Sequence, residues 1–171
     1  RARIISHIQT KYLGDVELAR KTGLSPLYNL TLQLAKHMSP TTRDQWAKTL
    51  EEAFFASASH RSRLVAALKA LGHAKEAKGI HRRWVMEGDS WKHLSAEDYW
   101  WLLRGLTQER ERAREARLRV AAHIEKRFLS KPESVRAVGI ETWRRLAHAL
   151  ARDLSDQVRA RWTTAIKAAF E

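Results

Sequence analysis

The sequence repeats itself at a spacing of 116 residues, and this feature restricts the fold more than any other. Residues 2–55 align without a gap on residues 118–171, and 15 of the 54 aligned pairs are identical. The stretch VRAVGIETWRRLAHALARDLS at 135–155 corresponds to ARKTGLSPLYNLTLQLAKHMS at 19–39. Segments this similar are expected to fold alike, so the chain must contain the same unit at least twice.

The middle of the chain reads as a third, degenerate copy. It has nearly the same length as either outer copy, and a shift of 56 positions places Gly23 on Gly79. A unit of this length exceeds the two-helix solenoid units of about 33–47 residues, so we expect three to four helices in each. We expect the units to stack into a compact or solenoid-like tandem array. The predicted units are residues 1–58, 59–117 and 118–171.

Composition predicts helices throughout. Only 7 of the 171 residues are glycine and 3 are proline, whereas the strong helix formers Ala, Leu, Arg and Glu are abundant. No stretch alternates apolar and polar residues between two turn signals, as a half-buried strand would. The chain is therefore predicted to be all-α.

Local signals divide each unit into helices. Gly23 is expected to end a short helix over 15–22, because glycine readily adopts positive φ. Ser25 followed by Pro26 is expected to begin the next helix, since serine caps helices and proline suits the first turn. The serines predicted to cap the fourth helix of each unit are Ser39, Ser95 and Ser155.

The segment TQERERAREARLR at 107–119 contains no helix breaker. Its glutamates and arginines stand three or four positions apart, and each such pair adds about 0.2–0.5 kcal/mol to a helix. We therefore expect one continuous helix that couples the second and third units.

Several functional classes are disfavoured by what the sequence lacks. It contains no cysteine, so disulfides and thiolate metal sites are excluded. No apolar run approaches a membrane span, and no signal segment opens the chain, which predicts a cytoplasmic protein without membrane contact. Phosphate-loop, zinc-protease, calcium-loop and nucleophile-elbow motifs are absent, so we predict no enzyme activity, metal or cofactor. Because the sequence begins with an arginine, we expect a longer parent chain.

The charge indicates a polyanionic partner. The chain carries 32 basic and 19 acidic residues, a net charge of +13, divided as +3, +5 and +5 over the three units. Arginine outnumbers lysine by about two to one, and its guanidinium both grips phosphate and stacks on bases. We therefore predict a nucleic-acid-binding module of a larger regulator or nucleoprotein complex, with DNA and RNA undistinguished. The alternative is an ordinary basic, soluble surface.

Candidate phosphate-binding residues cluster near predicted helix beginnings. Arg82 and Arg83 follow Gly79, and the pair Arg144 and Arg145 follows the corresponding glycine of the third unit. Helix beginnings present free backbone N–H groups, so arginines there would extend an anion-attracting stripe. Further candidates for nucleic-acid binding are Lys92, Arg104, Lys126 and Arg127.

Two tryptophans are candidate interface anchors. Trp91 and one of the pair Trp100 and Trp101 have no counterpart in the outer units. Neighbours on a helix point about 100° apart, so the pair is not expected to be fully buried within one unit. We predict Trp91 and Trp100 as contacts for a protein or a base, with burial between units as the alternative. This keeps open a rival function, a protein-interaction scaffold or oligomerisation domain without nucleic-acid contact, and a third, a tandem DNA-reading domain.

Overall fold

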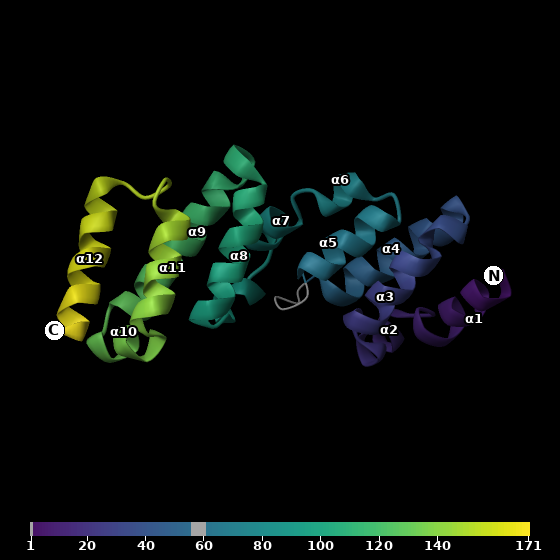
Figure 1. Cartoon of the computed structure of the whole chain (residues 1–171), viewed down its shortest axis with the longest axis horizontal. Coiled ribbons are helices and arrows are strands. Elements are labelled where there is room, and N and C mark those ends of the chain that lie inside the picture. The colour runs from purple at the N-terminus through teal and green to yellow at the C-terminus, as the bar shows by residue number, and fades with distance from the viewer. Residues whose placement is uncertain (1, 56–60) are drawn as a thin grey trace. The chain divides into compact units, whose positions relative to one another are not determined.

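The computed structural model describes residues 2–55 and 61–171, and these ranges contain twelve α-helices and no β-strand (Figure 1). The all-α prediction is therefore confirmed for the described chain. By their contacts the helices divide into two compact units, residues 1–80 and 81–171. We call these two the first and second unit, and they differ from the three repeats predicted from the sequence. The boundary between these two units, after residue 80, lies inside the predicted middle copy. The boundaries of the three predicted repeats stay a prediction.

In the first unit, helix α5 covers α3 and α4, which run beside it in Figure 1. The core between them is apolar and closed, with Leu27, Leu50 and Leu64 fully buried. The short α2 packs across α4. The helices of this unit are α1 (Ala2–Tyr12), α2 (Val16–Thr22), α3 (Leu24–Leu34), α4 (Pro40–Phe54), α5 (Arg61–Ala70) and α6 (Ala74–Ala77).

In the second unit, α8 is central and packs against both α9 and α11. Its core holds Trp84, Tyr99 and Trp143, each at most 1% exposed. The helix α9 continues into a single π-helical turn at Glu125–Leu129. The helices are α7 (Ile80–Glu87), α8 (Ala96–Gln108), α9 (Arg114–Ile124), α10 (Pro132–Val138), α11 (Ile140–Leu150) and α12 (Asp156–Phe170).

The bounds of α10, α11 and α12 equal those of α2, α3 and α4 shifted by 116 positions at both ends. The residue between the first two helices is glycine in both places. Gly23 has φ 86° and ψ 152°, and Gly139 has φ 84° and ψ 144°. These torsions lie beyond the ordinary left-handed helical region, in backbone space that L-residues avoid, so a side chain is disfavoured there.

A tertiary hydrogen bond also recurs at the same spacing. Arg20 of α2 donates through Nε to the carbonyl of Ala53 at 3.4 Å. Arg136 of α10 donates through Nη1 to the carbonyl of Ala169 at 3.2 Å. Each arginine thus fastens the short second helix to the last turn of the fourth.

Most of the predicted helix beginnings are confirmed. The hydroxyls of Ser39, Ser95 and Ser155 each accept a hydrogen bond from the backbone N–H three residues on, which satisfies a donor that the helix leaves free. The predicted cap at Ser25 is wrong. α3 already begins at Leu24, because the turn at the preceding glycine finishes one helix and starts the next, and the Ser25 hydroxyl instead accepts from Arg63.

The predicted continuous helix over 107–119 is also wrong. α8 ends at Gln108, and Arg110 has a positive φ of 56° before α9 begins. The cause is Arg117, which is buried and donates through Nη1 to the carbonyls of Leu106 at 3.2 Å and of Arg110 at 2.6 Å. The first carbonyl lies in the last turn of α8 and the second follows the end of that helix, so these tertiary bonds favour a break that the local sequence does not indicate.

Candidate nucleic-acid interface

Two tryptophans and two arginines meet on the surface of the second unit where α8 packs against α11. The Arg104 guanidinium carbon lies 5.0 Å from the Trp100 ring centroid and 5.4 Å from that of Trp101. From α11, the guanidinium carbon of Arg145 lies 5.3 Å from the Trp100 ring. We call these four residues the tryptophan–arginine cluster. Two sequence-predicted phosphate contacts and one predicted interface anchor are thereby brought together.

Helical spacing explains the cluster. In α8, Tyr99, Leu102, Leu103 and Leu106 are buried and define the inward face. Trp100 and Arg104 are one turn apart on the other side, so their side chains stack along the helix. Trp101, next to Trp100, turns further toward solvent and is 54% exposed, with its ring edge-on to Trp100 at 4.7 Å.

On α11 the inward face carries Trp143 and two leucines, which leaves Arg144 and Arg145 exposed. Both arginines contact Glu141. Arg144 donates to its two carboxylate oxygens at 3.0 and 2.6 Å, and Arg145 approaches at 3.6 Å. The hydrogen bonds from Arg144 hold the pKa of Glu141 below its usual value, and they raise the pKa of Arg144. Glu141 therefore neutralises part of the positive charge at this surface.

The two arginine pairs predicted to form a stripe occupy different positions along their helices. Arg82 and Arg83 are the third and fourth residues of α7, whereas Arg144 and Arg145 are the fifth and sixth of α11. Two residues along a helix correspond to a rotation of about 200°, so the pairs occupy different faces of their helices. Arg83 is moreover half-buried. A stripe formed by these two pairs stays a prediction.

The remaining basic candidates have different environments. Arg127 is structural: its Nη1 donates to the carbonyls of Lys92 at 3.0 Å and Leu94 at 2.6 Å, so it fastens α9's continuation to the loop before α8. Lys92 pairs with Asp89 and lies 5.9 Å from the Trp91 ring centroid. Lys126 is exposed on the π-helical turn. These residues lie outside the tryptophan–arginine cluster.

Trp91 is not an exposed anchor, which corrects that expectation. It is 3% exposed, and its indole N–H donates to the carbonyl of Gly88 at 2.8 Å. His123 of α9 packs edge-on against its ring at 5.3 Å and bonds the carbonyl of Lys92 at 2.8 Å. The tryptophan is thus buried inside the compact unit 81–171, against a residue of the predicted third repeat, which agrees with the alternative of burial between repeats.

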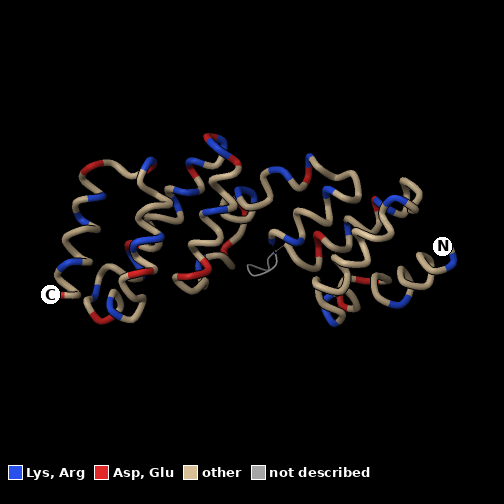
Figure 2. Tube along the Cα trace, viewed as in Figure 1, with Lys and Arg blue, Asp and Glu red and all other residues tan. Residues whose placement is uncertain are grey.

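Acidic side chains accompany the basic ones in both units, as Figure 2 shows. Exposed ion pairs three or four residues apart recur in α2, α9 and α12. Such pairs reduce the local field, so the net charge alone does not define a binding surface. An aromatic surface next to arginines is the more specific feature.

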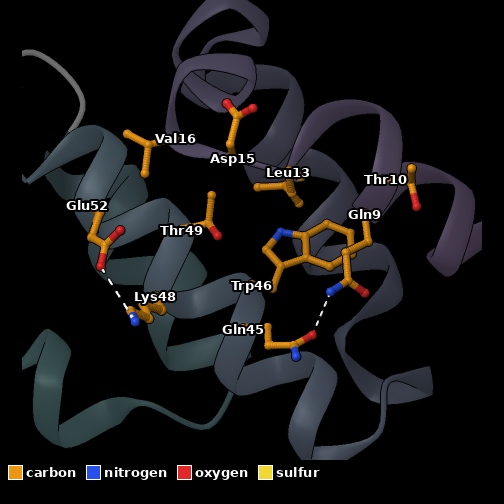
Figure 3. A pocket seen from close by; sticks show the side chains of 11 residues that line it. Gln9, Thr10, Leu13, Asp15, Val16, Gln45, Trp46, Lys48, Thr49 and Glu52 are labelled. Atoms are coloured by element: carbon orange, nitrogen blue, oxygen red, sulfur yellow. Dashed lines mark hydrogen bonds and ion pairs between the residues drawn. The ribbon is translucent and has the colours of Figure 1, made fainter.

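A concavity lies in the first unit, between the end of α1 and α4 (Figure 3). It has a volume of about 670 Å³ and is lined by Gln9, Thr10, Leu13, Gly14, Asp15, Val16, Gln45, Trp46, Lys48, Thr49 and Glu52. Its ionisable groups are one lysine and two carboxylates, and the lysine pairs with Glu52 at 4.0 Å. This balance does not favour a polyanion.

Trp46 in this groove differs from its aligned partner Trp162. The indole N–H of Trp162 donates to the Glu125 carboxylate at 2.9 Å. The residue aligned with Glu125 is Gln9, which donates instead to Gln45 at 2.7 Å, and the buried Trp46 N–H has no acceptor. Both tryptophans are core residues, since each is almost completely buried.

Of the cluster, sequence reasoning missed the role of Trp101 and the meeting of two helices. The spacing of Trp100 and Arg104 was a usable signal, because residues four apart on a helix are neighbours. Nothing in the sequence indicated that Arg145, 45 positions from Trp100, would reach the same ring.

Comparison with family models, curated proteins and solved structures found no match to this chain. Among residues 2–55 and 61–171 no group of three or more acidic or histidine side chains is arranged to hold a metal ion. Within the same ranges, none of the helices combines the length and apolar character needed to cross a bilayer.

Proposed function

We propose that this chain is a non-enzymatic module that binds single-stranded nucleic acid at the tryptophan–arginine cluster. The observation that carries the proposal is an indole, Trp101, left 54% exposed beside Arg104 and edge-on to Trp100, whose ring Arg145 of α11 also contacts. Proteins that hold single strands without sequence preference combine an aromatic stacking surface with basic groups for the backbone. The cluster offers both.

Each part of the cluster has a distinct task in this proposal. Trp101 stacks on a base, an interaction of about 1–3 kcal/mol that tolerates any base. Arg104 and Arg145 hold Trp100 by cation–π contact while their remaining N–H groups face phosphates. Binding is therefore weakly selective for sequence and strongly weakened by salt.

We further propose that the chain is a tandem array of three related units of four helices. Support comes from the equal spacing of the bounds of the last three helices in the outer copies and from positive φ at Gly23, Gly79 and Gly139. The serine cap of the fourth helix recurs in α4, α8 and α12. In this proposal the cluster lies where the middle and last of the three repeats meet.

The binding proposal is tested by fluorescence anisotropy of labelled single-stranded and duplex oligonucleotides, both DNA and RNA. Trp101→Ala should weaken single-strand binding at least about fivefold, the equivalent of one stacked base. The double variant R104Q/R145Q should weaken it further. Arg119→Gln, which removes one positive charge from an exposed pair outside the cluster, is the matched control for Arg104→Gln and Arg145→Gln made singly.

Two outcomes would contradict the proposal. The first is no salt-sensitive affinity for any oligonucleotide at low ionic strength. The second is binding that Trp101→Ala and Arg119→Gln weaken equally, because the cluster would then contribute no more to affinity than a charged residue elsewhere on the surface. A salt-stable complex with one protein, lost in Trp101→Ala, would favour the interaction-scaffold function instead.

A further inference from the structure

The indole N–H of Trp46 is a buried donor without an acceptor in the described part of the chain. Trp46 is 1% exposed and lines the concavity between the end of α1 and α4, where Figure 3 shows its nitrogen on the side of Leu13 and Thr49. We call this concavity the Trp46 groove. Buried donors are almost always paired, because an unpaired one loses its bond to water and gains nothing in return. The N–H therefore marks a place where an acceptor is missing.

The aligned place 116 positions later shows which acceptor this fold uses. There the Trp162 N–H donates to the Glu125 carboxylate at 2.9 Å, and Arg161 donates to the same carboxylate at 3.2 and 3.0 Å. In the first copy Gln9 stands in place of the glutamate and Gln45 in place of the arginine. The two amides bond each other at 2.7 Å. The first copy thus lacks both the internal acceptor and the cation that balances it.

The same position is open to solvent in the copy that another helix precedes. α8 packs on α9 there, yet the side chains of Arg161 and Glu125 are 53% and 31% exposed. Lys126 and Thr164, which align with two residues of the groove, are exposed as well. A preceding copy therefore does not cover this position, and its openness belongs to the fold of the copy itself.

The charges of the groove favour a neutral acceptor. Its ionisable side chains are Asp15, Lys48 and Glu52, and the lysine pairs with Glu52 at 4.0 Å. The place of the balancing arginine is held by Gln45. A carboxylate buried there would have no paired cation, which is strongly unfavourable. A carbonyl oxygen therefore suits the Trp46 N–H better than a carboxylate.

A peptide backbone supplies carbonyl oxygens of this kind. The side-chain amides of Gln9 and Gln45 each carry N–H donors and a carbonyl acceptor, which match the carbonyl and N–H of a peptide bond. The volume of about 670 Å³ is within the range of about 300–1,000 Å³ found for ligand pockets. Asp15 and Glu52 are exposed, so they attract a lysine or arginine side chain of the bound segment.

We propose that the Trp46 groove binds an extended, basic peptide segment of a partner protein, with one backbone carbonyl accepting from the Trp46 indole N–H. The nitrogen is closed to water in the free protein, so side chains around it move aside when the segment binds. Backbone hydrogen bonds with a few side-chain contacts are a usual mode of recognition for extended peptides. The groove lies in the first unit, and this inference is independent of the tryptophan–arginine cluster in the second.

The experiment selects short peptides from a randomised display library on the immobilised 171-residue protein and measures the selected peptides by fluorescence anisotropy. They should be enriched in lysine or arginine. Trp46→Phe should weaken their binding about three- to tenfold, the equivalent of one net hydrogen bond. Trp162→Phe is the matched control, because it makes the same change in the aligned tryptophan and should leave peptide affinity unchanged.

A second variant keeps the test decisive if Trp46→Phe disturbs the fold. Gln9→Glu combined with Gln45→Arg installs the acceptor and the cation of the aligned copy, so the Trp46 N–H is satisfied from within. Peptide affinity should then fall at least about tenfold, while the protein resists urea at least as well as the wild type. Selection that enriches no peptide on the wild type over the Trp46→Phe protein overturns the proposal. So do selected peptides that are acidic, or that bind the wild type and the Q9E/Q45R variant equally.

Discussion

Replacing Arg117 by methionine should lower the free energy of unfolding by about 3–5 kcal/mol, the usual cost of breaking a buried ion pair from one side. Arg117 bonds the Asp153 carboxylate at 2.7 and 3.0 Å, and the two side chains are 7% and 8% exposed. Methionine fills much of the same volume but leaves the carboxylate buried without a partner. It also leaves the carbonyls of Leu106 and Arg110 without a donor.

The assay is urea unfolding followed by far-ultraviolet circular dichroism, with the slope compared between variants. The exposed pair of Arg119 and Glu115 is the control, and Arg119→Met should cost less than about 1 kcal/mol. Adding Asp153→Asn to Arg117→Met should recover part of the loss, because the stranded charge is then removed. A cost below about 1 kcal/mol for Arg117→Met would refute the reasoning that this buried pair fixes the break between α8 and α9.

Three further predictions concern single residues. Glu141→Gln should raise affinity for single-stranded oligonucleotides severalfold in the anisotropy assay, because it frees the two arginines of α11; unchanged or weaker binding would argue against a role for those arginines. Gly139→Ala should cost about 1–3 kcal/mol in urea unfolding, since its φ of 84° strains any L-residue, although no atom lies within 4 Å of the added methyl group. Trp162→Phe should cost about 1 kcal/mol more than Trp46→Phe, because only the first change removes a hydrogen bond; equal costs would contradict this.

The helices were predictable because their boundaries are written locally. The serines that cap α4, α8 and α12 were predicted from the sequence, and each hydroxyl accepts from the backbone N–H three residues on. The break between α8 and α9 could not be predicted from the sequence, because it depends on tertiary hydrogen bonds. Arg117 stands in a run of glutamates and arginines typical of a solvated helix, and only the packing of α9 on α8 turns it inward.

The contacts of the candidate site also differ in whether the sequence alone could predict them. Trp100 and Arg104 are neighbours by helical spacing alone, so their pairing was within reach of the sequence. The burial of Trp91 was not, because it depends on His123 of α9. Arg127 reads as a surface charge, yet it donates to two loop carbonyls that only the folded chain brings near.

The salt dependence of single-strand binding tests the account of this surface most directly. For the wild type, the logarithm of the association constant should fall linearly with the logarithm of salt concentration. In the double variant R104Q/R145Q the slope should be shallower by about 1.4, at roughly 0.7 per lost phosphate contact on a single strand. A slope equal to that of the wild type would contradict the assignment of phosphate contacts to the α8–α11 surface.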